Sequence, residues 1–419
     1  MFQTAFTVAP GRLVAATGPD DVRAAVRHAA AHGLAVTVTN TGHGLAGPVD
    51  GGVLLDTSAL DEVVVDPRAR TARIGGGARW GQVVAAAAPH GLAPLNGSSP
   101  GVGVVGYLLG GGLGILGRTY GWAADHVRSL DLVTPDGESR HLAPGDELFG
   151  AVLGGGAAHR FGVVTAVTVD LVPVARLYGG SIAFDGAEAA PAEVLRGYLR
   201  WARALPATVT SSLAALVYPD LPALPPHLRG RYVLSVRVAC TGYSGSTAEG
   251  ERLVAPLRAL GPVMSDSLRE MPYTESPTIH ADPETPHAYW GDGILLDALD
   301  EEALAEVLRL TGPAAGRMAV VQLNHLGGAL ADAPAAPNSV PYREAAWLVR
   351  ALYPLGEDGP GPVRELHARV ERALAPRTLG RAVNFVFGDG ERREGLYDAE
   401  TAKRLAAVES ELDPANLSG

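Results

Sequence analysis

The chain of 419 residues contains 53 glycines and 31 prolines, is 47% hydrophobic and 19% charged, and is predicted to form a loop-rich globular protein of two domains. Its net charge of −11, without any cluster of basic residues, argues against a nucleic-acid or membrane-surface partner, because phosphates attract clustered Lys and Arg side chains. The single cysteine, Cys240, excludes a disulfide framework and a multi-thiolate metal site.

The N-terminal residues lack the charged and apolar regions of a secretory signal. No uninterrupted apolar stretch reaches the roughly 20 residues that a membrane-spanning helix needs. We therefore expect a cytoplasmic protein without a membrane span.

The first ~175 residues alternate short apolar strands, glycine-dense turns and two helical stretches. Gly33 and Gly91 end the two helices in the manner of C-terminal caps. Helices are expected at residues 20–32 and 80–90, and strands at 35–39, 53–56, 62–66, 71–74, 127–134 and 163–172. This part is predicted to be α+β.

Residues 102–117 form the most unusual stretch of the sequence. They are too rich in glycine for a stable helix interior and too apolar for a solvated loop. Buried backbone that lies close against a large planar or charged ligand would explain both features.

The second half mixes helices, strands and proline-rich connectors without a repeat. Helices are expected at residues 191–205, 248–260 and 398–412, and strands at 231–239, 291–296, 318–326 and 381–387. This pattern predicts one α+β domain that covers a substrate. Its few basic residues favour a neutral polycyclic or glycosylated substrate over an anion, and His280 and His287 are expected at the surface of a connector.

Two glycine-containing loops are candidates for binding a cofactor. Residues 39–44 end a strand in a polar loop whose backbone N–H groups suit a phosphate, with His43 between two glycines. Taken alone, this short motif fits a turn with a solvent-facing histidine at least as well. Residues 96–103 supply hydroxyls and amides for a pyrophosphate or the polar edge of an isoalloxazine ring. Neither loop matches the phosphate loop GxxxxGK[ST] or the dinucleotide fingerprint.

Further motifs follow these loops in a fixed order along the chain. The motifs comprise residues 39–43, 75–81, 103–107, 110–112, 120–121 with Asp125, 161–165, 325–329, 341–343, 384–385 and 412–417. Together they resemble the berberine-bridge-enzyme-like, 6-hydroxy-D-nicotine-oxidase-like branch of the vanillyl-alcohol-oxidase-type (PCMH-type) FAD-binding oxidoreductases. The resemblance covers nearly the whole chain.

The resemblance implies an FAD-binding domain at residues 1–174 and a substrate domain at 175–375 with an antiparallel sheet over the flavin. Residues 376–419 would then return to the FAD-binding domain. In the family, the histidine at the position of His43 bonds to the flavin 8α-methyl group. Ser99 replaces the cysteine that gives many members a second bond, so a single attachment is expected. Cys240 is interpreted as a buried small hydrophobe of the other domain.

The same resemblance assigns the remaining FAD contacts. The expected cofactor-binding residues, besides His43, are Thr39, Asn40, Thr41, Gly42, Gly44, Ser98, Ser99, Val102, Gly103, Gly106, Tyr107, Gly112, Gly162, Val164 and Asn384.

Three positions depart from the family pattern. Thr39 stands where the family often has arginine, and residues 153–160 replace a shorter Arg-Gly-Gly-Gly-Gly-Asn stretch. Phe385 follows Asn384 where many oxidases of this branch have tyrosine. A phenol base is therefore unavailable at that position.

The implied reaction is hydride transfer from a small organic, natural-product-like substrate to flavin N5, followed by reoxidation by dioxygen. The candidate catalytic bases are Tyr342, His325 and Tyr107. For each of them a structural hydrogen bond is the competing interpretation, and Tyr107 also suits a brace for the flavin. No cluster of His, Asp and Glu has metal-ligand spacing, so no metal is expected.

Two other functions remain open from the sequence. Some flavoproteins of this branch are cyclases without net redox change in natural-product biosynthesis, and Phe385 is compatible with that alternative. A protein that binds flavin without turnover is the third possibility, although both cofactor loops are intact.

Overall fold

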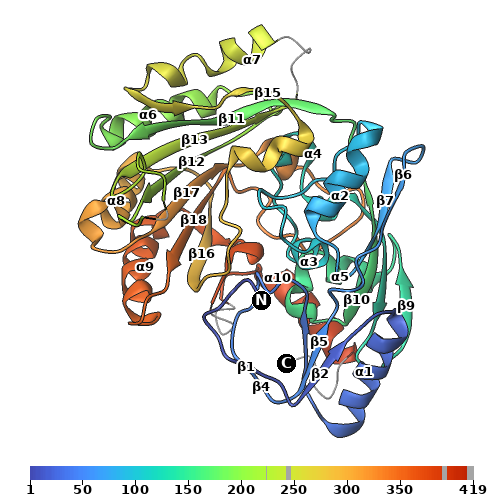
Figure 1. Cartoon of the computed structure of the whole chain (residues 1–419). Helices are drawn as coiled ribbons and strands as arrows, with labels where there is room; N and C mark the ends of the chain where they lie inside the picture. The colour runs from blue at the N-terminus through green and yellow to red at the C-terminus, as the bar shows by residue number, and fades with distance from the viewer. Residues whose placement is uncertain (223, 242–246, 389–393, 413–419) are drawn as a thin grey trace.

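The computed structural model describes residues 1–222, 224–241, 247–388 and 394–412. Figure 1 shows a large twisted sheet beside a smaller, mixed part formed by the first half of the chain. This is the α+β architecture expected from the sequence. The end of the predicted motif at 412–417 lies outside the described residues.

The first part contains three sheets and several helices. A parallel three-stranded sheet has the order β2 (Arg12–Ala15), β5 (Val53–Asp56), β3 (Val36–Thr39), and β1 (Val8–Ala9) pairs with β4 (Val49–Asp50). The antiparallel five-stranded sheet has the order β6 (Val63–Asp66), β7 (Thr71–Gly75), β10 (Val163–Asp170), β8 (Val127–Val133), β9 (Ser139–Leu142). The helices are α1 (Pro19–His32), α2 (Trp80–Ala87), α3 (Val104–Leu109), α4 (Gly117–Tyr120) and α5 (Glu147–Gly155).

The second part is built on a nine-stranded sheet. Its order is β14 (Val263–Asp266), β11 (Arg176–Asp185), β13 (Tyr232–Cys240), β12 (Val209–Val217), β17 (Val320–His325), β18 (Trp347–Pro354), β16 (Tyr289–Leu296), β19 (Thr378–Arg381), and β15 (Arg269–Pro272) also pairs with β11. The helices are α6 (Pro191–Arg203), α7 (Thr247–Val254), α8 (Glu301–Thr311) and α9 (Gly361–Leu374). After β19, α10 (Ala399–Leu412) packs against α5 of the first part.

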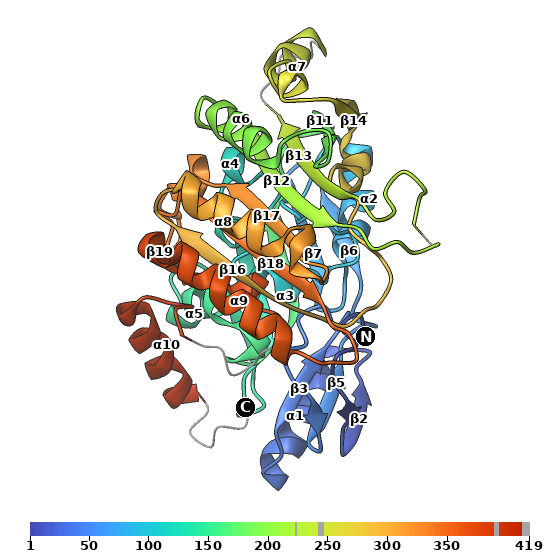
Figure 2. The same ribbon diagram turned by 90° about the vertical axis from the view of Figure 1, so that its left-hand side faces the viewer.

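Helices α6, α8 and α9 cover one face of the large sheet, as Figure 2 shows. Inward-facing residues such as Val236, Leu323 and Val349 join these helices in one apolar core. Because side chains alternate across a strand, their neighbours along each strand face the first part of the chain. Several of these neighbours are polar, so the buried face of the sheet toward the first part is suited to binding rather than to core packing.

The structure corrects three local predictions. Residues 381–387 are not one continuous strand, because a 3₁₀ turn, Val383–Phe385, interrupts the pairing with β16 after Arg381, and the pairing returns at an isolated bridge between Phe387 and Gly291. Residues 104–109 within the glycine-rich stretch are helical, since only Gly106 interrupts their apolar run. The helix expected to reach residue 260 ends at Val254, shortly before Pro256.

Candidate active site

His43 lies in the loop that follows β3 and is held from three sides. Its Nδ1 is 2.8 Å from the Thr41 hydroxyl, and its ring stacks on Phe2 with the two centroids 3.9 Å apart. The Tyr289 hydroxyl of β16 donates to the His43 carbonyl oxygen at 2.5 Å. Burial is the main cause that lowers the pKa of His43 to about 4. The imidazole is therefore half-buried, fixed and neutral at pH 7, unlike a solvent-facing turn residue.

The two glycine loops predicted from the sequence meet at this histidine. A Cβ built on Gly101 would lie 3.8 Å from both His43 Cε1 and Ser99 Oγ. A Cβ on Gly103 would come within 2.8 Å of Asn40 Nδ2, so the glycine lets the Asn40 side chain lie this close to the second loop. The two loops thus form one continuous surface around the imidazole.

Tyr107 and Asn384 support the second glycine loop through hydrogen bonds to its backbone and to the residues around it. The Tyr107 hydroxyl donates to the Leu95 carbonyl oxygen at 3.2 Å. The Asn384 amide donates to the Tyr107 carbonyl oxygen at 3.0 Å and accepts from the Gly112 N–H at 2.8 Å. Burial raises the pKa of Tyr107 well above its ordinary value. Tyr107 is therefore a buried residue that supports the loop, and both the oxygen and the nitrogen of the Asn384 amide bind backbone of this loop.

Two features of the glycine loops suit a dinucleotide: exposed glycine backbone, and a side-chain amide oxygen without a hydrogen-bond partner. Gly106 is the exposed residue of the otherwise buried helix α3, and a Cβ there would meet no atom within 4 Å. A Cβ on Gly44 would also meet open space. The buried Asn40 Oδ1 has no hydrogen-bond partner. Because an unpaired buried acceptor costs free energy, the site is built for a polar ligand, and the residues present fit FAD.

A second cavity, of about 370 Å³, lies between α1, β3 and β10. Val36 and Val38 of β3 form one wall, and Gly162, with φ +126°, lines it just before β10. His159 also lines it with φ +60°, and its Nδ1 is buried without a partner. Burial lowers the pKa of His159 to about 4. An apolar slot with one neutral imidazole suits a flat heteroaromatic ring. Val164, the next residue on β10 after Val163, is buried.

A further candidate ligand space is a cavity of about 440 Å³ between the first part and the large sheet. Ser98, Leu113 and Ile115 line it from the first part, and Phe385 closes another side. The polar residues of the second part that line it include Thr210, Ser212, Arg237, His280, Gln322, Asn324 and Arg350. Ser98 precedes Ser99 in the chain, so the second glycine loop runs from this cavity to His43.

The cavity corrects two expectations drawn from the sequence. His280 is not a surface residue, because it lines the cavity, whereas His287 is partly exposed and its ring lies edge-on to the Phe2 ring with the centroids 5.3 Å apart. The environment is not poor in basic groups either, since Arg237 and Arg350 both reach it. Sequence spacing gave no signal for this, because these residues are brought together only by strand pairing.

The candidate bases Tyr342 and His325 lie away from the cavity lining. His325 points to the helix-covered side, where it stacks on Trp347 with centroids 4.7 Å apart. Its Nε2 is 3.1 Å from Arg118 Nη1, and burial lowers its pKa to about 3. Tyr342, with φ +52°, packs against Gly380. The structure therefore does not bring Tyr107, His325 and Tyr342 together around one reacting centre.

Buried neutral histidines predict how stability depends on pH. Burial lowers the pKa of His159 to about 4 and those of His280 and His325 to about 3, below the ordinary 6.5. Between these values and pH 6.5 the unfolded chain binds protons that the folded chain does not, so stability falls as pH falls through this window. We expect the thermal midpoint to drop steadily from pH 6.5 to pH 4.5. His325→Gln should flatten this slope, whereas an unchanged slope would contradict the assignment.

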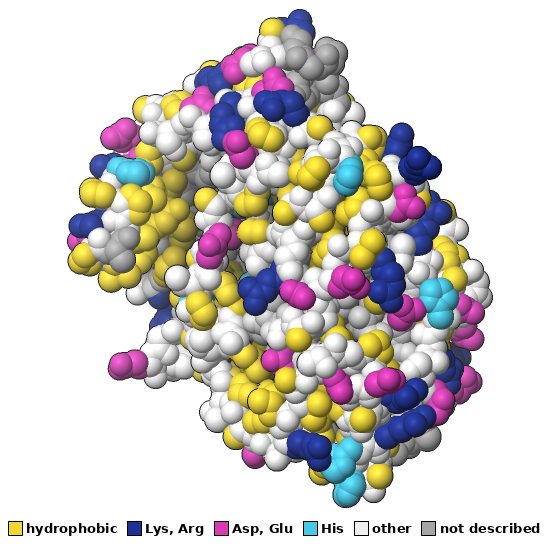
Figure 3. Space-filling model, turned by 45° about the vertical axis from the view of Figure 1, so that its right-hand side comes forward, with side chains coloured by type: hydrophobic (Ala, Val, Ile, Leu, Met, Phe, Trp, Pro, Cys, Tyr) yellow, Lys and Arg dark blue, Asp and Glu magenta, His cyan; other side chains and the backbone are white. Residues whose placement is uncertain are grey.

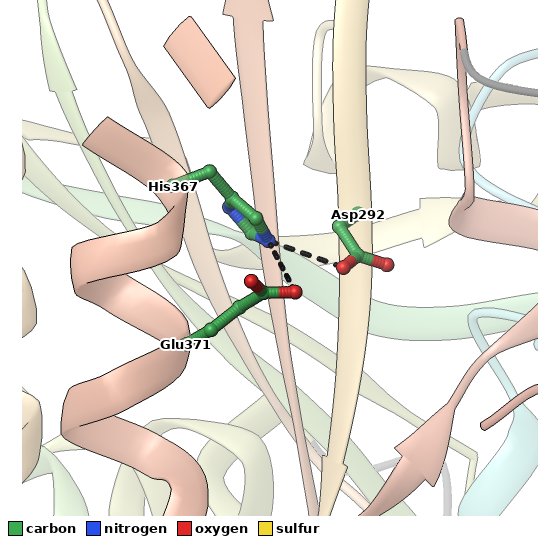
Figure 4. A group of neighbouring side chains, drawn as sticks. All are labelled: Asp292, His367 and Glu371. Carbon is green, nitrogen blue, oxygen red and sulfur yellow. Dashed lines mark hydrogen bonds and ion pairs between the residues drawn. The ribbon is translucent and has the colours of Figure 1, made fainter. Parts of the chain in front are cut away.

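Asp292, His367 and Glu371 form a compact group whose ligand atoms lie within 4.8 Å of one another (Figure 4). Asp292 projects from β16, and the other two project from α9. Arg381 also forms ion pairs with both Asp292 and Glu371. This guanidinium supplies the positive charge that a metal ion would otherwise provide, so we interpret the group as a buried ion network.

The surface shows no large field of one charge on the face in Figure 3, where basic and acidic side chains are interspersed. Within the described ranges, no helix combines the length and apolar character needed to cross a bilayer.

Comparisons with known proteins agree with this site. Residues 10–143 match the family model of an FAD binding domain. The chain is 31% identical to (R)-6-hydroxynicotine oxidase of Paenarthrobacter nicotinovorans over 97% of this chain and 89% of that protein. The crystal structure of 6-hydroxy-D-nicotine oxidase from Arthrobacter nicotinovorans superimposes with a TM-score of 0.81 at 28% identity, covering 97% and 90% of the two chains. The Physcomitrella patens BBE-like 1 structure, at 20% identity and covering 97% and 89%, shares the fold with a TM-score of 0.79.

Fold, glycine loops and cavity together define a flavoprotein oxidoreductase with FAD as its cofactor. The chain belongs to the berberine-bridge-enzyme-like branch of the vanillyl-alcohol-oxidase-type family, the branch of its 6-hydroxynicotine oxidase relative. It is an FAD-dependent enzyme that acts on a small organic molecule, and the relatives favour oxidation over a redox-neutral cyclisation.

Proposed function

We propose that this enzyme is an oxidase that carries FAD on one covalent bond from His43 and passes substrate electrons to dioxygen. The observation that carries the proposal is the state of His43. Its imidazole is neutral, Thr41 engages Nδ1, and no hydrogen bond to Nε2 is found within the described residues. A neutral nitrogen with a free lone pair is the nucleophile that attachment to a flavin methyl group requires.

A single bond is supported by the residues at the two other candidate positions. Ser99 lies beside His43, but its hydroxyl cannot supply a thioether. Cys240 is buried in the apolar core between the large sheet and its helices, on the side away from the cavity. Thr39, Gly42 and Val102 lie in the same two loops, and we assign them to the FAD surface with the other predicted loop residues.

The second cavity would take the adenine ring, and the cavity over the large sheet would take the substrate. Bound FAD would accept a hydride from the substrate and return the electrons to dioxygen. The chain's own groups orient the substrate and exclude water. His280 Nδ1, buried at this cavity without a partner, is the proton acceptor that the geometry offers, in place of Tyr342 and His325.

We also propose that residues 1–174 form the FAD-binding domain and residues 175–375 most of the substrate domain. The return to the first domain would begin only after β19, which pairs with β16. The Tyr397 hydroxyl donates to the Gly154 carbonyl oxygen at 2.9 Å, and Arg160 pairs with Glu409 at 2.5 Å. These contacts support α10 as part of the FAD-binding domain. A natural-product substrate fits the proposal and would place the enzyme in secondary metabolism.

Oxygen reactivity is testable without knowing the substrate. Protein reduced anaerobically with dithionite should return to the oxidised spectrum within seconds of mixing with air-saturated buffer, and hydrogen peroxide should form in equal amount to the flavin. An artificial acceptor such as dichlorophenolindophenol serves as the comparison. Fast reaction with that dye but reoxidation by dioxygen over many minutes would show a dehydrogenase and contradict the oxidase assignment.

A further inference from the structure

The cavity over the large sheet presents a row of polar side chains on one face. Strand pairing places Ser212 directly opposite Arg237 and Asn324, and Gln322 directly opposite Arg350. Residues of one parity on each strand point to the same side, so all five face the first part of the chain. Apolar residues alone would suffice to pack a sheet, and this row therefore indicates a polar ligand.

Arg350 is the member of this row whose charge and N–H donors most need a partner. Its guanidinium lies 4.0 Å from the centre of the Phe385 ring, which fixes the plane of the fork. No hydrogen bond or ion pair to Arg350 is found within the described part of the chain. Burial lowers its pKa to about 10, so it remains charged at pH 7. A charged fork of five N–H donors thus faces the cavity without an acceptor.

Neighbouring side chains add donors rather than acceptors. Arg237 donates to Gln322 Oε1 at 2.9 Å. This bond leaves the Gln322 amide nitrogen as a buried donor, and it has no partner among the described residues. The Ser212 hydroxyl is also buried without a partner. Asn324 Oδ1 is an acceptor without a partner among the described residues, whereas the Ser212 hydroxyl can donate or accept. The ligand that satisfies most of the set is therefore rich in acceptors.

The charges at the cavity leave an excess of one positive charge. Arg237 and Arg350 are cationic, and Asp282 is anionic because the neighbouring Arg237 charge and the hydrogen bond from Ser98 oppose the effect of burial, and its pKa is lowered. Asp282 also accepts a hydrogen bond from the Ser98 hydroxyl. Burial lowers the pKa of His280 to about 3, so this ring contributes no charge at pH 7. One anion would balance the set.

We propose that the substrate of this enzyme carries a carboxylate that Arg350 binds through its guanidinium fork, with Gln322 and Ser212 as additional donors. A planar, bidentate anion matches the fork better than a point charge or a neutral hydroxyl does. The inference rests on the proposed function, since it takes this cavity as the substrate site. It replaces the neutral substrate expected from the composition with an alcohol or amine that bears a carboxylate.

The test is ligand binding to the oxidised, FAD-loaded enzyme. We would titrate acetate, benzoate and 2-naphthoate, each against its own uncharged amide, and follow the perturbation of the flavin absorption. At least one acid should bind at least tenfold more tightly than its amide. Arg350→Met should weaken that acid about 10- to 100-fold without affecting the amide. Arg350→Lys should give an intermediate loss because it keeps the charge but not the fork.

Two further variants keep the result interpretable. Arg309→Met removes an exposed arginine of α8 and should change nothing. Gln322→Leu should weaken the acid alone, and this variant still tests the proposal if Arg350→Met does not fold. Equal binding of every acid and its amide, or acid binding that survives Arg350→Met, would overturn the proposal. If Arg350→Met kept its acid binding but had a lower flavin midpoint potential, Arg350 would instead be a residue that stabilises the reduced flavin. Failure of the covalent bond or of oxygen reactivity appears in separate assays and leaves this readout intact.

Discussion

His43→Ala is expected to abolish covalent flavin completely while the protein still folds and binds FAD. Wild-type protein precipitated with trichloroacetic acid should give a yellow pellet, whereas the variant should give a white pellet and a yellow supernatant. The reason is local, because His43 is the neutral imidazole at the junction of the two glycine loops. The flavin midpoint potential of the variant should also be lower, because the flavin no longer carries the imidazole of His43 as an electron-withdrawing substituent.

Matched variants separate attachment from packing. His287→Ala removes the neighbouring histidine that packs on Phe2 and should leave the pellet yellow. Thr41→Val removes the partner of His43 Nδ1 and should slow attachment, whereas Thr41→Ser should restore it. A white pellet from wild-type protein that had bound FAD would show that no bond forms. A yellow pellet from His43→Ala would place the bond on another residue.

The cofactor loops could be predicted from the sequence because their signals are local. Residues 39–44 lie at the end of a predicted strand, and glycines recur where other atoms approach the backbone closely, as the Asn40 side chain does at Gly103. Caps at Gly33 and Gly91 likewise mark the ends of their helices. Such features depend on neighbours in the chain, which is what a sequence displays.

The cavity over the large sheet could not be predicted because its residues meet only through strand pairing. Arg237, Gln322 and Arg350 come from β13, β17 and β18, and each one alone reads as an ordinary strand residue. Some strands of the large sheet were also not recognised from the sequence. Two glycines interrupt β11 and two serines interrupt β12, which dilutes the Val-rich pattern of a strand.

The alternation of side chains along a strand explains why the candidate base His325 does not line the cavity. His325 and Asn324 are consecutive, and a strand turns consecutive side chains to opposite faces. Asn324 therefore lines the cavity, whereas His325 packs on Trp347 behind it. A shift by one residue in the alternation decides which residue can touch a substrate, and the sequence alone does not fix it.

The buried network at Asp292 is expected to be the most sensitive point of the second part. Asp292 is fully buried, and Arg381 pairs with it and, at 2.6 Å, with Glu371. His367, also buried, lies 3.1 Å from Asp292 and 3.2 Å from the Tyr353 hydroxyl. Removing this cation takes a positive charge away from two carboxylates that lie close together.

Arg381→Met should therefore lower the free energy of unfolding by about 3–5 kcal/mol, the usual cost of removing one partner of a buried ion pair. Chemical denaturation of the FAD-loaded protein, followed by circular dichroism, measures the change. Arg377→Met is the matched control, because Arg377 lies 3.9 Å from Asp297 and both side chains are about half exposed, so its loss should cost less than about 1 kcal/mol. Asp292→Asn combined with Arg381→Met removes the second charge and should recover part of the loss. If the group instead held a metal ion, dialysis against EDTA would lower the stability of the wild-type protein, and equal stability with and without EDTA is the result that an arginine-neutralised network requires.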